Sequence, residues 1–198
     1  MRNTINIMMK DNSYSMYNLL NTVQQCQKCN LCKSRNSVVF GEGKINPSIM
    51  FIGEGPGYDE DIQGRPFVGR SGQLLIKMIE KNTKYNREDI YITNIVKCRP
   101  PNNRNPEFLE ISTCLPYLNE QIRIVNPKII VLLGAVAFEG LIGMKGITKH
   151  RGQWSEYKGI KVIPTFHPSY LLRFPIQEKY FLDDLEKIVN FLKVNNIY

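Results

Sequence analysis

The five cysteines are the residues of this chain whose type and spacing point most clearly to chemistry. Cys26 and Cys29 form a C-x-x-C pair, Cys32 follows, and Cys98 and Cys114 lie far downstream. An odd number of cysteines leaves one over from any complete disulfide framework. Thiolates at irregular spacing are typical ligands of zinc or of an iron–sulfur cluster. We therefore expect ligation, against the alternative of five small buried hydrophobic side chains.

The sequence around these cysteines indicates which kinds of cysteine site are favoured. A redox C-x-x-C motif lies in a βαβ unit, whereas this pair precedes the first expected strand, so a redox motif is disfavoured. A zinc ribbon would repeat the C-x-x-C pair, and this chain does not. Cys98 is flanked by Lys97 and Arg99, whose charges favour a thiolate. Pro116 is expected to break or kink the helix beside Cys114. The residues alone leave zinc and iron–sulfur ligation open.

Three loops carry the other chemically capable side chains. Glu54 lies in the sequence Gly-Glu-Gly-Pro-Gly at 53–57, Phe67 lies between two glycines at 64–69, and His167 precedes Pro-Ser. A carboxylate and a histidine can act as general acid or base, and a phenylalanine in a glycine-rich loop can stack on a base. No Gly-Lys-Ser/Thr follows residue 57, and Pro56-Gly57 argues against an immediate helix. The 53–57 loop is therefore not expected to bind phosphate as nucleotide-binding loops do.

The elements that must position these loops alternate between strand and helix. Apolar runs predict strands at 49–53, 90–92, 129–133 and 161–166, and helical spacing predicts helices around 13–25, 74–79, 111–125 and 182–192. This pattern favours an α/β fold with a mainly parallel sheet covered on both faces. Ligands bind such sheets at the carboxyl ends of the strands. The loops at 54–57, 94–106 and 167–169 follow three of those ends.

Length, composition and net charge indicate the number of domains, the location and the type of partner. The chain has 198 residues, 42% hydrophobic and 22% charged, which predicts one globular domain spanning 1–198. No apolar run reaches the roughly 18 residues of a membrane span, and the first 12 residues lack a long apolar segment, so we expect a cytoplasmic protein. The net charge of +8 favours a polyanionic partner such as nucleic acid, although a generically basic protein is the alternative.

Six segments together resemble the family 4 uracil-DNA glycosylases, the iron–sulfur type found in archaea and many bacteria. They occur in the family's order and cover nearly the whole chain after residue 25. The segments are Val38–Gly43, Gly53–Gly57, Gly64–Gly69, Thr93–Arg104, Ile147–Gly152 and His167–Arg173. The resemblance implies a three-layer αβα fold with a four-stranded, mainly parallel sheet. It also implies a [4Fe–4S] cluster on Cys26, Cys29, Cys98 and Cys114, with Cys32 outside that set.

The resemblance also assigns a role to each loop residue. Glu54 would lie near the scissile bond, Phe67 would stack on uracil, and Asn94 would read its polar edge. His167 would contact uracil O2, and Glu60 would oppose the methyl group of thymine. Gly53 and Gly55 allow the backbone to approach the base closely. The implied partner is uracil-containing DNA, single- or double-stranded, and the protein is expected to act as a monomer.

Contacts to the DNA backbone are expected from the cations of these segments. The expected phosphate contacts are Arg65, Lys97, Arg99, Arg104, Lys149, Arg151 and Arg173. Leu171 or Leu172 is the expected wedge into the emptied base stack, the alternative being that either is core. Two other functions compete with an enzyme: a non-catalytic module that recognises damaged DNA, and a small-nucleotide-binding protein. Because no lysine except Lys97 stands out in the motif loops, we expect no lyase activity.

Overall fold

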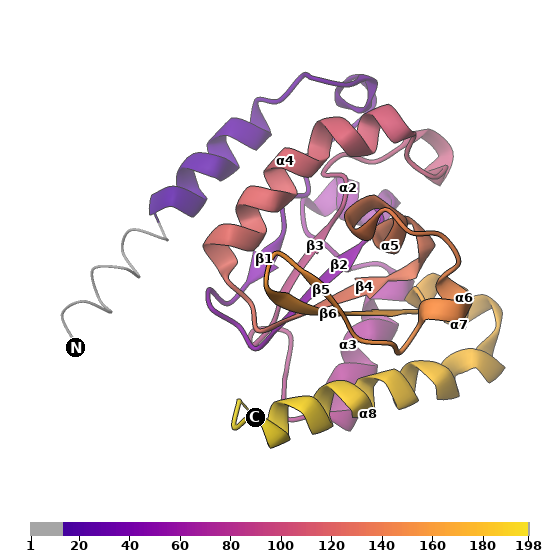
Figure 1. Ribbon diagram of the computed structural model, residues 1–198. Coiled ribbons are helices and arrows are strands. Elements are labelled where there is room, and N and C mark those ends of the chain that lie inside the picture. Colours follow the sequence, from indigo (N-terminus) through magenta and orange to yellow (C-terminus); the bar gives the residue numbers. More distant parts are fainter. Residues whose placement is uncertain (1–13, 198) are drawn as a thin grey trace.

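The computed structural model describes residues 14–197, and a six-stranded sheet lies at its centre (Figure 1). Four strands form the parallel middle of the sheet, in the order β3 (Tyr91–Asn94), β2 (Ile49–Gly53), β4 (Ile129–Leu133) and β6 (Ile160–Thr165). These are the four strands expected from the apolar runs. The expected strand number is too small, because β1 (Glu42–Gly43) and β5 (Ser155–Tyr157) add one antiparallel strand at each edge.

Helices cover both faces of the sheet, which confirms the three-layer prediction. All residues of β2 and β4 are buried, as expected for parallel strands with two covered faces. Phe51 packs in the cluster with residues of α3 (Arg70–Asn82), α7 (Pro168–Arg173) and α8 (Glu178–Val194). Met50 and Ile52 face the opposite cluster, which includes residues of α4 (Phe108–Val125) and α5 (Gly134–Ile142). The N-terminal helix, residues 14–24, lies beside α4 (Figure 1).

Two expectations about helix boundaries are wrong. The short helix α2 (Tyr58–Gln63) begins directly after Gly57, and acidic residues at 59–61 favour its first turn electrostatically. Helix α4 continues through Pro116. The hydrogen bond lost at Pro116 is outweighed by burial of the apolar face of α4 and by a capping box between Glu107 and Glu110.

The carboxyl ends of the parallel strands meet at one edge of the sheet. β3 and β4 flank β2 on opposite sides, so the chain order reverses at β2, where α/β folds form ligand-binding crevices. The remaining short elements of the described residues are η1 (Asn30–Lys33), η2 (Pro101–Asn103), α6 (Ile147–His150) and η3 (Pro175–Gln177). None of the helices within residues 14–197 is both long and apolar enough to cross a membrane.

Candidate active site

A pocket of about 220 Å³ opens at this carboxyl edge, and the loops after β2, β3 and β6 form its walls. It brings together the predicted residues Glu54, Gly55, Glu60, Phe67, Asn94 and His167. The described residues that complete its lining are Pro56, Gly57, Ser71, Pro100, Asn103, Arg104 and Ser169. Its size suits one planar base.

Phe67 and Asn94 meet over Gly53, at the end of β2. A Cβ atom on Gly53 would lie 2.5 Å from both the Asn94 Oδ1 atom and the Phe67 Cζ atom. Asn94 is 2% exposed, and its Oδ1 has no hydrogen-bond partner among the described residues. A buried acceptor without a donor is costly, so this oxygen points to a ligand N–H group. The pocket therefore offers an aromatic face and a polar edge reader.

Adding a single methyl group at residue 53 tests whether the pocket requires glycine at this position. We expect Gly53→Ala to lower kcat/KM on the substrate that the resemblance implies, uracil-containing DNA, by about 5- to 150-fold, which corresponds to the roughly 1–3 kcal/mol that overpacking a filled site costs. The cause is the clash with Asn94 and Phe67, which must separate. Gly140→Ala is the matched control, since a Cβ there meets its nearest neighbours at 3.4 Å and lies outside the pocket. Equal activity of the two variants would contradict the close packing at Gly53.

His167 is held as a neutral hydrogen-bond donor. It caps the N-terminus of α7, where its Nδ1 atom accepts the backbone N–H of Ser169 at 3.2 Å and lies 2.8 Å from the Ser169 hydroxyl. Because that backbone group can only donate, the ring proton is assigned to Nε2. Burial, with a smaller contribution from the charge of Arg173, lowers the pKa of His167 to about 4. The role of Ser169 was not predicted from the sequence, although Pro168 at the first helical position indicates that His167 is a cap.

Two carboxylates occupy different environments in the pocket. Glu54 follows β2, and burial raises its pKa above the ordinary value. Glu60 is buried in α2, and its Oε1 atom accepts the backbone N–H groups of Val68 at 2.9 Å and Gly69 at 2.8 Å. Glu60 therefore holds the loop that carries Phe67, in addition to the predicted role against the thymine methyl group.

Two of the expected phosphate contacts are wrong. Lys97 is 1% exposed, and its Nζ donates to Thr93 Oγ1 at 2.6 Å and to the Asn94 carbonyl at 2.7 Å. Arg151 is largely buried, where it pairs with Asp184 and donates to the Tyr180 carbonyl. Both cations satisfy polar groups inside the fold and are not available to DNA.

The two wedge candidates in α7 differ in how far their side chains are buried. Leu171 is 2% exposed and belongs to the core, so its expected role as a wedge is wrong. Leu172 is 40% exposed and remains available.

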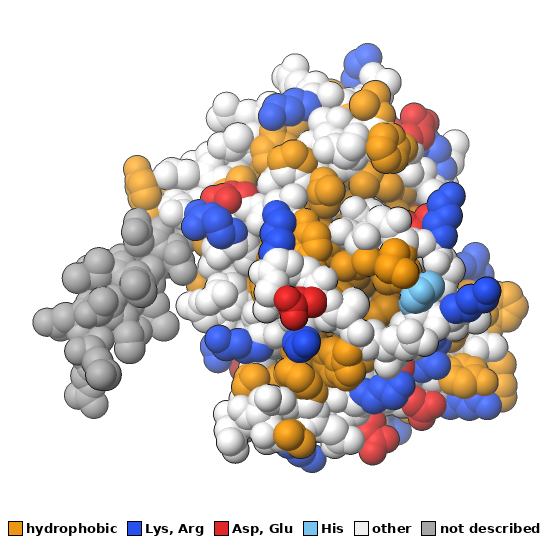
Figure 2. All heavy atoms as spheres, in the orientation of Figure 1, with side chains coloured by type: hydrophobic (Ala, Val, Ile, Leu, Met, Phe, Trp, Pro, Cys, Tyr) orange, Lys and Arg blue, Asp and Glu red, His pale blue; other side chains and the backbone are white. Residues whose placement is uncertain are grey.

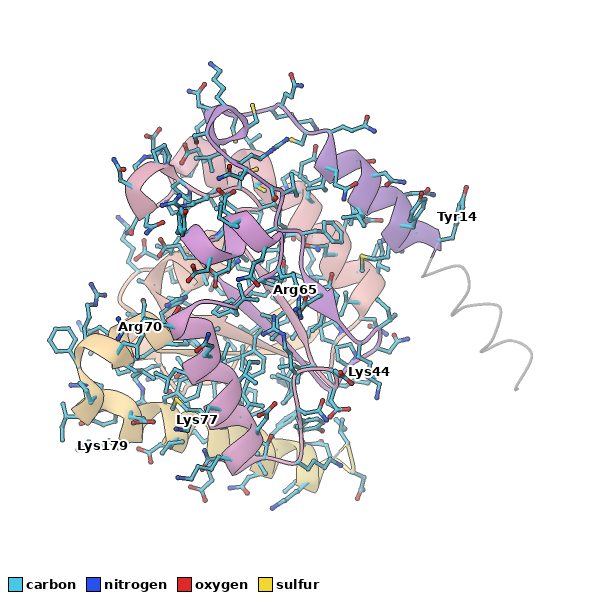
Figure 3. All side chains as sticks on the ribbon, turned by 180° about the vertical axis from the view of Figure 1, so that it is seen from behind. Tyr14, Lys44, Arg65, Arg70, Lys77 and Lys179 are labelled. Carbon is cyan, nitrogen blue, oxygen red and sulfur yellow. The ribbon has the colours of Figure 1, made fainter. Side chains whose placement is uncertain are left out.

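The other expected phosphate contacts are at least partly exposed. Arg104 lines the pocket while pairing with Glu110, and Arg65 pairs with Glu42. Arg99 donates to Asn103 Oδ1 and lies over the Tyr58 ring, whereas Lys149 and Arg173 are exposed. Basic side chains are spread over the face shown in Figure 2. On the opposite side, Arg65 and Arg70 lie near the loop before α3 (Figure 3).

All five cysteines are free and line one cavity between the N-terminal segment, the loop after β3 and α4. Arg35 donates to Cys98 Sγ at 3.1 Å in this cavity. Among the described residues, no three His, Cys, Asp or Glu side chains are close enough to hold a single metal ion. A cluster places several iron atoms between its ligands, so its sulfurs stand further apart than those of a tetrahedral zinc site. An all-thiol donor set is typical of structural zinc sites and of iron–sulfur clusters alike.

Comparison with known proteins agrees with this fold and pocket. The uracil DNA glycosylase superfamily matches residues 40–192, so the chain belongs to that superfamily. It is 50% identical over 165 residues to a type-4 uracil-DNA glycosylase of Thermotoga maritima, covering 81% of this chain and 85% of the relative. It is 46% identical to a type-4 enzyme of Sulfurisphaera tokodaii, covering 80% and 76%. Within the superfamily it is a type-4 member.

A more distant branch is also similar. A type-5 uracil-DNA glycosylase of Pyrobaculum aerophilum is 33% identical over 147 residues, covering 65% of this chain and 64% of the relative. The higher identity and coverage of the type-4 relatives agree with the predicted family.

Proposed function

We propose that the protein is a DNA repair enzyme that removes uracil by hydrolysing its N-glycosidic bond, leaving an abasic site. The observation that carries the proposal is the buried, unpartnered Oδ1 atom of Asn94 beside the Phe67 ring. Uracil carries an N–H donor at N3, where cytosine has an acceptor. The N3–H group of uracil can therefore satisfy this oxygen. Membership of the type-4 family supports the same activity.

The reaction follows from the positions of the pocket side chains. Uracil must leave the base stack, at a cost of a few kcal/mol, which stacking on Phe67 and the hydrogen bond to Asn94 offset. As the bond between C1′ and N1 breaks, its electron pair moves to uracil and the sugar becomes cationic. The Nε2–H group of His167 stabilises the uracil anion at O2. Glu54 stabilises the cation or orients the water that adds to C1′; this water loses a proton to the solvent, and the uracil anion takes up one in return.

Uracil-containing DNA is the proposed partner, bound by a monomer. Arg65, Arg99, Arg104, Lys149 and Arg173 contact phosphates, and Leu172 fills the emptied stack. Binding should weaken steeply with salt because each phosphate contact releases counterions. No lysine is among the described residues that line the pocket, and the Lys97 amine is bonded elsewhere. We therefore propose that the enzyme lacks lyase activity.

A [4Fe–4S] cluster on Cys26, Cys29, Cys98 and Cys114 is the second part of the proposal. These thiols share one cavity, and a cytoplasmic location would keep them reduced. Bound there, the cluster would cross-link the N-terminal segment to the loop after β3 and to α4, and it would take no part in the hydrolysis. Lys97 supports this role, because it lines the cysteine cavity and its Nζ atom donates to the Asn94 carbonyl. The cross-link would thus fix the segment that carries the uracil reader.

Removing one proposed ligand should remove the cluster. We expect Cys98→Ser to lose the brown colour and most of its iron, and to lower Tm by about 5–10 °C, as for the loss of a few kcal/mol. Cys32→Ser is the matched control and should keep colour, iron and Tm, because Cys32 lies outside the proposed set. Iron analysis, visible spectra and thermal unfolding measure these outcomes. Retention of the cluster in Cys98→Ser would contradict the assignment.

A uracil-release assay tests the proposed function directly. Anaerobically purified protein is incubated with an oligonucleotide containing one uracil, and with the same oligonucleotide containing cytosine. We expect free uracil and alkali-labile sites from the first, no release from the second, and no strand nicking without alkali. Binding of uracil-DNA without release would instead support a non-catalytic recognition module.

A further inference from the structure

The backbone of Phe67 has an unusual conformation for an aromatic residue. Its φ angle is +52°, in the left-handed region that a residue with a Cβ adopts only at a cost in free energy. This conformation directs the ring over Gly53, where it forms one wall of the pocket. The ring centroid lies 5.8 Å from that of His167. A change of φ at this residue would therefore move the stacking surface.

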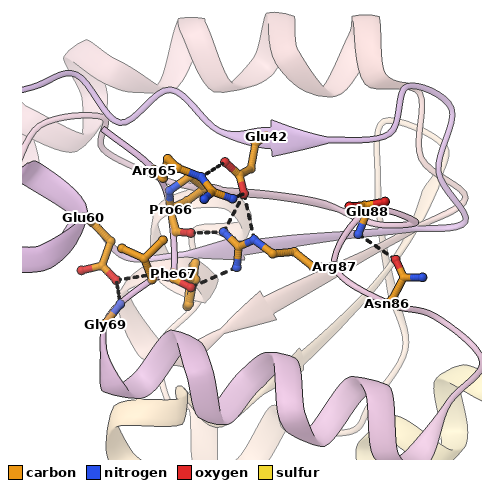
Figure 4. Close-up of polar contacts among 10 residues, drawn as sticks. Glu42, Glu60, Arg65, Pro66, Phe67, Gly69, Asn86, Arg87 and Glu88 are labelled. Atoms are coloured by element: carbon orange, nitrogen blue, oxygen red, sulfur yellow. Dashed lines mark hydrogen bonds and ion pairs between the residues drawn. The ribbon is translucent and has the colours of Figure 1, made fainter. Parts of the chain in front are cut away.

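Arg87 holds the two carbonyl groups on either side of this strained residue (Figure 4). Its Nη1 atom donates to the Phe67 carbonyl at 3.0 Å, and its Nη2 atom donates to the Pro66 carbonyl. Its third donor, Nε, bonds to Glu42 Oε1 at 2.8 Å. Arg87 is twenty residues from Phe67 in the sequence, and it is not among the described residues that line the pocket.

Glu42, on strand β1, fixes the orientation of Arg87. It also accepts two hydrogen bonds of 2.9 Å from Arg65, so its carboxylate joins two guanidinium groups. Burial opposes ionisation of Glu42, but the bonds from Arg65 and Arg87 lower its pKa below the ordinary value. The carboxylate is therefore charged at neutral pH, and its bond to Arg87 is charge-assisted.

The opposite side of the same loop is held by a group of opposite charge. Glu60 accepts the N–H groups of Val68 and Gly69, while Arg87 occupies the carbonyls of Pro66 and Phe67. Four consecutive residues are thus held between an anion and a cation (Figure 4). Gly72 on α3 lets the helix approach closely, because a Cβ there would lie 2.1 Å from the Phe67 carbonyl carbon.

We propose that Arg87, oriented by Glu42, is a positioning residue for uracil recognition, which acts by holding Phe67 in its left-handed conformation. The proposal rests on the proposed function, since it concerns the stacking surface of that pocket. Lysine should not replace Arg87, because a single ammonium lacks the planar fork that reaches two carbonyls and a carboxylate together.

A double-mutant cycle tests whether Arg87 acts through Phe67. We expect Arg87→Met to lower kcat/KM on a single-uracil oligonucleotide by about 10- to 100-fold, the effect of releasing one strained residue. Free uracil should inhibit this variant more weakly by a similar factor. In a Phe67→Ala background the same substitution should change kcat/KM by less than about twofold, because the ring it positions is absent. Equal losses in both backgrounds would overturn the proposal.

Two further variants separate positioning from folding. Arg87→Lys retains the charge, and we expect its kcat/KM and its affinity for free uracil to fall while Tm stays within a few degrees of wild type. Full activity of Arg87→Lys would also overturn the proposal. Arg123→Met removes a comparable arginine, paired with Glu120 on the surface of α4, and should leave activity unchanged. Inactivity of the wild-type protein on uracil-DNA would instead refute the proposed function itself.

Discussion

His167→Ala should reduce the single-turnover rate of uracil release by about 10²- to 10³-fold, which corresponds to roughly 3–4 kcal/mol of transition-state stabilisation from one preorganised donor. The reason is the loss of the Nε2–H group at uracil O2. Because His167 is neutral and its Nδ1 is occupied by Ser169, the donor is already oriented before the substrate binds. The loss should therefore appear in the chemical step and less in DNA binding.

The second histidine provides a matched control. His150 packs its ring 5.3 Å from that of Phe138 and is not among the described residues that line the pocket. His150→Ala should keep the wild-type rate within a few-fold. Rapid-quench measurement of uracil release, with Tm for both variants, distinguishes a lost donor from a lost fold. A His167→Ala enzyme that keeps the wild-type rate would show that another group stabilises the leaving anion.

Glu54→Gln should reduce the same rate by about 10²- to 10⁴-fold, the usual range for a group that moves a proton or faces developing charge. It should also change the pH dependence. Burial raises the pKa of Glu54, so the protonated, inactive form accumulates at a higher pH than for an exposed glutamate. The wild-type rate should fall as the pH drops through this raised pKa. His167, with a pKa of about 4, stays neutral over most of that range.

The pH profile of the variant identifies the group responsible. In Glu54→Gln the residual rate should be independent of pH across the range in which the wild-type rate falls. Glu120→Gln removes an exposed carboxylate paired with Arg123 and should retain the wild-type profile. An acid limb that persists unchanged in Glu54→Gln would assign this ionisation to another group. These measurements are made as single-turnover rates, so that product release does not obscure the ionisation.

The central strands and the pocket were predictable because their signals are local. Each parallel strand is a mostly apolar run, and the carboxyl ends of β2, β3 and β6 lead into loops with a functional side chain, whereas β4 leads directly into α5. Parallel pairing then brings Glu54, Asn94 and His167 to one edge without further information. The edge strands β1 and β5 have two and three residues, which is too short for an alternating pattern to be recognised.

The errors concern side chains whose partners are set by tertiary structure. A lysine after a strand is usually exposed, whereas Lys97 turns inward to Thr93 and the Asn94 carbonyl. Leu171 and Leu172 are adjacent leucines, of which one faces the core and the other the solvent. A helix of six residues has too few positions for the sequence pattern to show which of its faces is buried. The contact between Arg87 and Phe67 joins two loops twenty residues apart and has no local signal.

The shortness of the two edge strands has a consequence for self-association. Without them, β3 and β6 at the edges of the parallel sheet would present unpaired N–H and C=O groups to other copies of the chain. β1 covers β3 through two residues, and its Gly43 lies so close to β3 that a Cβ would be 2.0 Å from the Ile90 carbonyl oxygen. A larger residue at 43 would detach β1 and uncover a template for edge-to-edge aggregation. Gly43 therefore helps to prevent aggregation through this edge of the sheet.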